Sequence, residues 1–234
     1  MSIAKVISGV MMIPLFLLLN SCSRNSKLQV HVASSIYPAI QLLKDSLDLD
    51  IDIQQGATGI IHKQLLLGQE ADIVVIIQKE WLNQFQQDFS VKETKLIAKN
   101  RLCLISKKDS LLNVQEALNS NSLGLANPDF VPLGYYSLQI MQWYTDSVIT
   151  PFLFNSAAQV KKMIDLGEIP KAIVYQSQVT KEYFQYCFPN SIQPDIRSFC
   201  LRMNDKENSI SIFNQLTSSN AIKLISLEDQ VYLK

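Results

Sequence analysis

Residues 28–47, LQVHVASSIYPAIQLLKDSL, change their hydrophobic period once, and this change predicts a strand followed by a helix. From Leu28 to Ala33 apolar and polar residues alternate, which is typical of a strand. After Ser34-Ser35 the apolar residues recur every three or four positions and share one helical face, namely Ile36, Ile40, Leu43 and Leu47. Ser35 stands where a side chain can cap the helix, so we interpret the segment as strand, serine and helix.

The same unit follows a second time. A short strand at Asp50–Ile53 leads into Gly56-Ala57-Thr58-Gly59, and an apolar helix from Ile60 to Leu67 ends at Gly68. The run from Ala71 to Ile77 is rich in β-branched residues. Such a run is typical of a parallel strand that is covered on both faces.

Strands and helices keep alternating along the rest of the chain. The later elements that we predict are a strand at Leu102–Ser106, a helix at Val114–Leu118, a strand at Leu123–Ala126, a helix at Tyr135–Tyr144, a helix at Ala157–Leu166, a strand at Ala172–Tyr175 and helices within Ser209–Leu224. The segment from Tyr183 to Arg202 is less periodic. This order predicts an α/β fold of two lobes, with lobe 1 at residues 28–104 plus 186–234 and lobe 2 inserted at 105–185.

Composition limits the classes of function. The chain has 234 residues, 47% of them hydrophobic, which is enough for a buried core. Lys and Arg together number 21, as do Asp and Glu, so no overall field attracts nucleic acid or anionic lipid. With only two histidines and no Cys-x-x-Cys spacing, a zinc or iron site is not expected, and neither is a cofactor.

The amino terminus has the pattern of an export signal. Lys5 precedes a nearly apolar run from Val6 to Leu19, and Leu19-Asn20-Ser21-Cys22 resembles the lipobox of bacterial lipoproteins. Residues 1–21 are therefore expected to be a lipoprotein-type signal peptide, Cys22 the lipidation site and residues 22–27 a tether. The protein would then be anchored in the cell envelope, facing the periplasm or the exterior. The alternative is a plain signal peptide with an unpaired Cys22.

Three cysteines follow in the predicted folded part. Cys103 lies in an apolar run and is most simply a small core residue. Cys187 and Cys200 lie in one polar region of an exported chain, so a disulfide between them is an open alternative to two free thiols.

Three stretches place a small hydroxyl residue at the start of a predicted helix: Ser34-Ser35, Thr58 and Ser156. A helix amino terminus exposes free N–H groups and about half a positive charge. Several such termini around one cleft would form an anion site of neutral donors. The alternative for each residue is a simple helix cap.

Several segments, in this order and spacing, carry a family resemblance. They are Val32-Ala33-Ser34-Ser35, Gly56-Ala57-Thr58-Gly59, Gly68-Gln69-Glu70-Ala71-Asp72-Ile73 with Trp81, Ala98-Lys99-Asn100-Arg101-Leu102, Asn127-Pro128-Asp129-Phe130-Val131-Pro132-Leu133-Gly134-Tyr135-Tyr136 and Ala172-Ile173-Val174-Tyr175. Together they resemble the periplasmic molybdate-binding proteins of ABC transporters, which have the type II periplasmic binding-protein fold. The resemblance implies two lobes, each a mixed, mainly parallel sheet flanked by helices, joined by a two-crossover hinge near Leu102–Ser106 and after Tyr175.

The same resemblance implies a binding site and partners. The oxyanion, molybdate or tungstate, would take hydrogen bonds from Ser35, Thr58, Leu133, Ala157 and Tyr175, with Ser34, Gly59 and Ser156 as secondary candidates. Leu133 and Ala157 would act through their N–H groups. The protein would be a monomer that closes over the anion and delivers it to a membrane permease. Asn127 and Gln178 stand where the family has Asp.

Other functions remain possible at this point. The same fold also hosts binding proteins for other small anions and organic solutes, and a sensor or adhesin that has lost its ligand is a further alternative. Arg101 and Lys63 could serve an organic anion, but neither lies on a predicted anion loop. An enzyme is not expected, because Ser35 has no evident base and no Gly-x-Ser-x-Gly motif occurs. We interpret His62 and Lys161-Lys162 as solvent-facing, Trp81 and Trp143 as packing residues, and Tyr135-Tyr136 as structural.

Overall fold

The computed structural model describes residues 27–107, 113–144 and 150–228. The predicted signal peptide, the lipidation site Cys22 and nearly all of the predicted tether lie outside these residues. Within the described part, no helix has the length and apolar character needed to cross a membrane.

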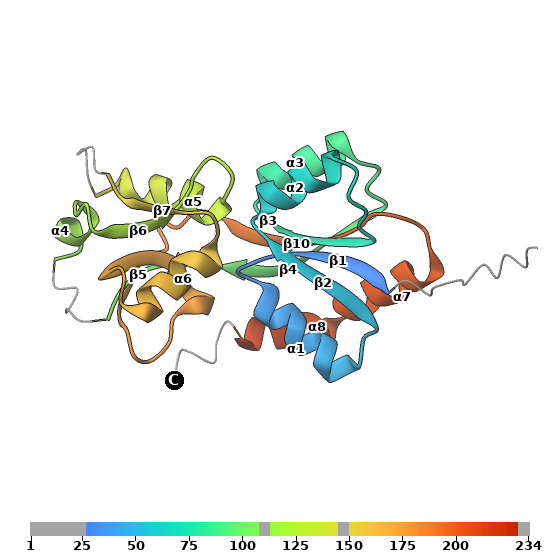
Figure 1. The fold of residues 1–234 in the computed structure, drawn as a ribbon. Helices are drawn as coiled ribbons and strands as arrows, with labels where there is room; N and C mark the ends of the chain where they lie inside the picture. The colour runs from blue at the N-terminus through green and yellow to red at the C-terminus, as the bar shows by residue number, and fades with distance from the viewer. Residues whose placement is uncertain (1–26, 108–112, 145–149, 229–234) are drawn as a thin grey trace, which may run out of the picture.

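The strands form two separate five-stranded sheets (Figure 1). The first has the order β2-β1-β3-β10-β4 and consists of β1 (Leu28–Ala33), β2 (Ile51–Gly56), β3 (Ile73–Ile77), β4 (Glu93–Asn100) and β10 (Ile196–Arg202). The second has the order β7-β6-β8-β5-β9 and consists of β5 (Leu102–Ser106), β6 (Leu123–Ala126), β7 (Phe152–Phe154), β8 (Lys171–Tyr175) and β9 (Phe184–Cys187). Both sheets are mixed, since β10 and β5 run antiparallel to their neighbours.

Helices cover the sheets and complete two lobes. The first lobe carries α1 (Tyr37–Leu47), α2 (Thr58–Leu66), α3 (Lys79–Asp88), α7 (Glu207–Leu216) and α8 (Ser219–Glu228). The second carries α4 (Val114–Leu118), α5 (Pro132–Met141), α6 (Ala157–Leu166) and the 3-10 turn η1 (Gln176–Gln178). In Figure 1, α2 and α3 lie on one face of the first sheet, and α1 and α8 lie on the other. The predicted two-lobed α/β fold is thus confirmed.

The unbroken apolar run of β3 fits this layering. All five of its residues are buried. Val74 and Ile76 pack with Phe85 of α3 in one core cluster, whereas Val75 lies in the other cluster with Ile40 of α1. A strand covered on both faces needs apolar residues at every position, as its sequence indicated.

The chain crosses between the sheets twice, at Arg101 and between Cys187 and Ile196. The expected lobe boundaries at 104/105 and 185/186 fall inside β5 and β9, which both belong to the second sheet. Gln193 ties the two crossovers together: its side chain accepts a hydrogen bond from the Leu102 N–H at 3.0 Å and donates to the Leu102 carbonyl at 2.9 Å.

The disulfide of the structure joins a different pair of cysteines from the one that the sequence left open. Cys103 and Cys187 are bonded, and they stand opposite each other on the antiparallel strands β5 and β9. The Cys187–Cys200 disulfide, which the sequence left open, does not form, because Cys200 lies in β10 of the other sheet as a buried free thiol. Cys103 is buried as predicted, but its apolar surroundings gave no sign of a partner 84 residues away.

Candidate functional site

A small pocket lies where the two lobes meet. The first lobe lines it with the loops that follow β1, β2 and β3, and the second with the starts of α5 and α6 and the end of β8. Its non-atom space, open solvent included, is about 210 Å³. The lining residues are Ala33, Ser34, Ser35, Gly56, Ala57, Thr58, Ile77, Val131, Pro132, Ala157 and Tyr175.

Most of the sequence-predicted site residues come together here. Ser35, Thr58, Ala157 and Tyr175 line the pocket, and so does Ser34. Leu133 is fully buried and directly follows the lining residue Pro132. The secondary candidates Gly59 and Ser156 are adjacent to lining residues but are not part of the lining.

Three helices begin at this pocket, at Thr58, Pro132 and Ala157. The first N–H groups of a helix have no partner within the helix, and they carry the positive end of its dipole. Among the described residues, the N–H groups of Ser35, Thr58, Leu133 and Ala157 donate to no other protein atom. The pocket therefore offers unpaired backbone donors from both lobes.

The predicted capping roles hold for only one of the hydroxyl residues. Ser156 caps α6, since its Oγ accepts from the Gln159 N–H at 3.1 Å. Ser35 is not a cap, because α1 begins at Tyr37 after Ile36, with no side-chain cap. Thr58 is not a cap either: it is the first residue of α2, after Ala57. The side chains of Ser35 and Thr58 are thus available to the pocket.

Thr58 is held so that its hydroxyl can donate. Thr58 is only 1% exposed, and its Oγ1 accepts a hydrogen bond from the Ile77 N–H at 3.4 Å. A hydroxyl that already accepts keeps its own proton free for donation. The Thr58 hydroxyl proton has no acceptor among the described residues. It is therefore available to a ligand in the pocket.

Tyr175 presents the least satisfied polar atom of the pocket. Its side chain is 1% exposed, and its hydroxyl has no hydrogen-bond partner among the described residues. Burial, and next the neighbouring Tyr136, raise the pKa of the Tyr175 phenol well above its ordinary value. The hydroxyl therefore stays protonated and acts as a donor. A buried hydroxyl without a partner is unfavourable unless a ligand accepts from it.

Gln178 and Asn127, the two departures from the family pattern, make hydrogen bonds to nearby backbone groups. Gln178 Oε1 accepts from the Tyr175 N–H at 3.2 Å, and its Nε2 donates to the Ala157 carbonyl at 3.4 Å. Asn127 Oδ1 accepts from the Asp129 N–H at 2.9 Å, which shapes the loop before α5. The Gln178 amide thus joins two lining residues, whereas the Asn127 amide acts within its own loop.

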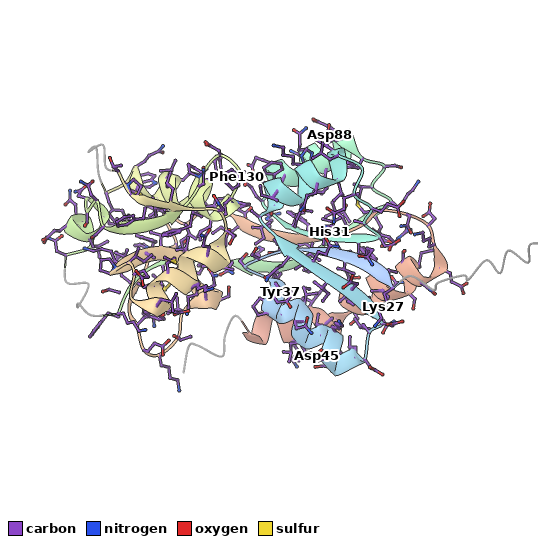
Figure 2. The ribbon with its side chains drawn as sticks, viewed as in Figure 1. Lys27, His31, Tyr37, Asp45, Asp88 and Phe130 are labelled. Atoms are coloured by element: carbon purple, nitrogen blue, oxygen red, sulfur yellow. A yellow bond between two sulfur atoms is a disulfide. The ribbon has the colours of Figure 1, made fainter. Side chains whose placement is uncertain are left out.

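Gly59 has a different role from the predicted one. Its N–H donates to the Phe130 carbonyl of the second lobe at 3.2 Å, so it is not free for a ligand. A Cβ on Gly59 would lie 2.8 Å from that carbonyl oxygen and 2.8 Å from the Trp81 ring. Figure 2 shows Phe130 at the border between the lobes. Only glycine permits this close contact between the lobes.

Three further interpretations need correction. His62 is 8% exposed, and its Nε2 lies 2.7 Å from Asp88 Oδ2, so the prediction of a solvent-facing ring is wrong. Trp143 is 69% exposed and is not a packing residue, whereas Trp81 packs beside His62. Lys162 is exposed as predicted, whereas Lys161 is half-buried in an ion pair with Asp165, and both lysines line a second pocket between the lobes.

The polar side chains that line the small pocket are uncharged hydroxyls. No carboxylate, imidazole, lysine or arginine is among its lining residues. Across the described residues, no group of three or more His, Cys, Asp and Glu side chains is placed to hold a metal ion. The lining offers hydrogen-bond donors to a small anion, and it has no charged group to accept a proton from it.

Comparisons with known proteins agree on the fold. A family model of bacterial extracellular solute-binding proteins matches residues 28–198. No curated protein sequence matches the chain.

Solved structures extend this agreement. The periplasmic molybdate-binding protein of Azotobacter vinelandii is 16% identical, with a TM-score of 0.73 over 86% of this chain and 97% of its own. A substrate-binding domain from Clostridium difficile, attributed to a molybdenum ABC transporter, is 16% identical, with a TM-score of 0.61 over 85% and 95%. The bromide-bound regulatory domain of HypT from Salmonella typhimurium is 12% identical, with a TM-score of 0.61 over 87% and 96%. At identities this low, the likenesses show the shared fold alone.

Proposed function

Because the chain belongs to the bacterial extracellular solute-binding protein family, we propose that it captures a tetrahedral oxyanion, molybdate or tungstate, and delivers it to an ABC permease. The observation that carries this proposal is the buried Tyr175 hydroxyl, which has no partner among the described residues and lines a pocket of neutral donors. Membership in an extracellular family supports export of the protein.

The donor set is suited to a dianion. Ser35 and Thr58 would give hydroxyl and N–H groups, Leu133 and Ala157 their N–H groups, and Tyr175 its phenolic O–H. Removing a dianion from water is unfavourable. Each hydrogen bond to a charged acceptor contributes about 1.5–3 kcal/mol of favourable free energy. Five or more converging donors could then offset the loss of hydration.

The same donors would discriminate between anions. Hydrogen phosphate carries a proton that needs an acceptor, and the lining offers no carboxylate or imidazole to accept it. Molybdate and tungstate are fully deprotonated near neutral pH and leave no group unpaired. The lack of a general base in the lining also supports binding without chemical conversion.

A different small anion on the same fold is the second candidate. The observation that favours it is the uncharged, hydroxyl-bearing lining, which can donate hydrogen bonds to any small anion. Sulfate shares the charge and shape of molybdate but is smaller, so its oxygens would lie farther from donors placed for a larger ion.

Isothermal titration of residues 23–234 with molybdate, tungstate, sulfate and phosphate tests the proposal. We expect saturable binding of one molybdate or tungstate per chain, with sulfate and phosphate weaker by a factor of about ten or more. Tightest binding of sulfate would favour the second candidate. The absence of saturable heat with all four anions would contradict both.

Lobe closure should depend on Gly59. In Gly59→Ala the new methyl group would overlap the Phe130 carbonyl and the Trp81 ring, so the lobes could not close fully. Overpacking of this kind costs roughly 1–3 kcal/mol, and we expect molybdate affinity to fall about 5- to 150-fold. Titration measures the affinity, and small-angle scattering should show less compaction with molybdate than in the unmodified protein.

Ile60→Ala provides a matched control for Gly59→Ala. Ile60 is the next residue of α2, is 37% exposed and does not line the pocket, so its truncation should leave the affinity unchanged. Unaltered affinity and compaction in Gly59→Ala would show that the Gly59–Phe130 contact has no part in binding.

A further inference from the structure

Two wider grooves between the lobes adjoin the small pocket, and they differ in charge. The lysine groove, defined by Lys161, Lys162 and Asp165 of α6 facing the start of α1, has about 1080 Å³ of non-atom space. The acidic groove, defined by Glu80 of α3 and Asp129 before α5, has about 610 Å³. Helices α1 and α3 cover opposite faces of the first sheet (Figure 1). Since the lysine groove is lined by the start of α1 and the acidic groove by α3, the two grooves lie toward opposite faces of that sheet.

The lysine groove is continuous with the small pocket. Ser34, Ser35 and Ile77 line both, so an ion that leaves the pocket past the two serines enters this groove directly. Asn100, Ser177 and Gln178 also line the groove and add polar groups to a lining that is partly apolar. These groups and the two serines offer hydrogen-bond partners to an anion along this route.

The charges of the lysine groove do not cancel. Lys161 Nζ lies 2.6 Å from Asp165 Oδ1, and Asp165 also accepts from the Tyr183 hydroxyl. Lys162 is exposed, and no carboxylate of the described residues pairs with it. One positive charge is thus left uncompensated at the mouth of a pocket that suits an anion, in a chain whose formal net charge is zero.

The acidic groove is the less favourable side for an anion. Its lining includes Glu80 and Asp129 but no lysine or arginine. It shares only Val131 with the small pocket, and Trp81, which lies close to Gly59, is part of its lining. The two carboxylates therefore repel anions on this side.

We propose that the oxyanion enters and leaves through the lysine groove, where Lys162 is the main residue that concentrates anions at the entrance. This inference rests on the proposed function and adds the path by which the oxyanion reaches and leaves the small pocket. Charges of one sign at the mouth of a cleft raise the local concentration of the oppositely charged ligand and its association rate. Because Lys162 does not line the small pocket, its charge should act on association far more than on dissociation.

Stopped-flow mixing with molybdate, followed by the change in tryptophan fluorescence, tests the route. In Lys162→Gln the association rate constant should fall about 2- to 5-fold at low ionic strength, and in Lys162→Glu further. Both differences should fade in about 1 M salt, where the screening length is roughly 3 Å. The dissociation rate constant should change little.

Lys63→Gln and Glu80→Gln are the matched controls. The first removes the same charge from an exposed position of α2 outside both grooves, so the association rate should stay unchanged. The second removes a charge from the acidic groove and should not slow association. An unchanged rate in Lys162→Gln, or an equal loss in Lys63→Gln, would overturn the route while leaving molybdate binding intact. No molybdate binding by the unmodified protein would instead overturn the proposed function, and the route with it.

Discussion

Replacement of Cys103 and Cys187 together by alanine is expected to lower the free energy of unfolding by about 2–4 kcal/mol. The disulfide joins positions 84 residues apart and so restricts a long loop of the unfolded chain. The loop-entropy relation gives an upper value of about 4.5 kcal/mol for a loop of that size, and measured effects are usually smaller. The bond also holds β5 to β9 where both crossovers leave the second sheet.

Denaturant unfolding under non-oxidising and oxidising conditions measures this effect. The unmodified protein treated with a reductant should approach the unfolding midpoint of the double variant, and the double variant itself should not respond to the reductant. Cys200→Ala serves as a control, because it removes a buried free thiol but should keep the response to reductant. An unfolding midpoint of the double variant equal to that of the unmodified, oxidised protein would contradict the prediction.

Local patterns predicted the fold where burial follows a simple period. β1 and β3 were evident from alternation and from an unbroken apolar run, and α6 from its cap at Ser156 and its end at Gly167. The interior strand β10 was missed because it buries polar residues. Ser198 and Arg202 are both buried, and Arg202 is stabilised by Asp205 at 2.7 Å and Glu93 at 3.5 Å. Such partners cannot be inferred from periodicity.

In the site, too, local sequence motifs predicted some residues, whereas contacts between residues far apart in the chain could not be predicted. Ser35, Thr58, Ala157 and Tyr175 were predicted through motifs that end a strand or begin a helix, and the structure brings them to one pocket. The use of the Gly59 N–H by the Phe130 carbonyl could not be predicted, because it depends on how the lobes meet. The burial of His62 likewise depends on Asp88, 26 residues away, and on the rings of α3.

Tyr175→Phe should change ligand affinity and protein stability in opposite directions. Without ligand, the variant should be more stable by about 1 kcal/mol, because it no longer buries a hydroxyl that lacks a partner. Molybdate affinity should fall by about 1.5–3 kcal/mol, roughly 10- to 150-fold, because a hydrogen bond to a charged acceptor is lost. Thermal unfolding with and without molybdate, together with titration, measures both effects.

Tyr136→Phe distinguishes the loss of a donor from the loss of any buried phenol. Tyr136 is 4% exposed and lies close enough to raise the pKa of Tyr175, but it does not line the pocket, so its variant should bind molybdate normally. If Tyr175→Phe instead lost stability and kept its affinity, the hydroxyl would have a structural partner and no role toward the ligand. The opposite signs are therefore the decisive result. Removal of a purely structural hydroxyl would not both stabilise the protein without ligand and weaken ligand binding.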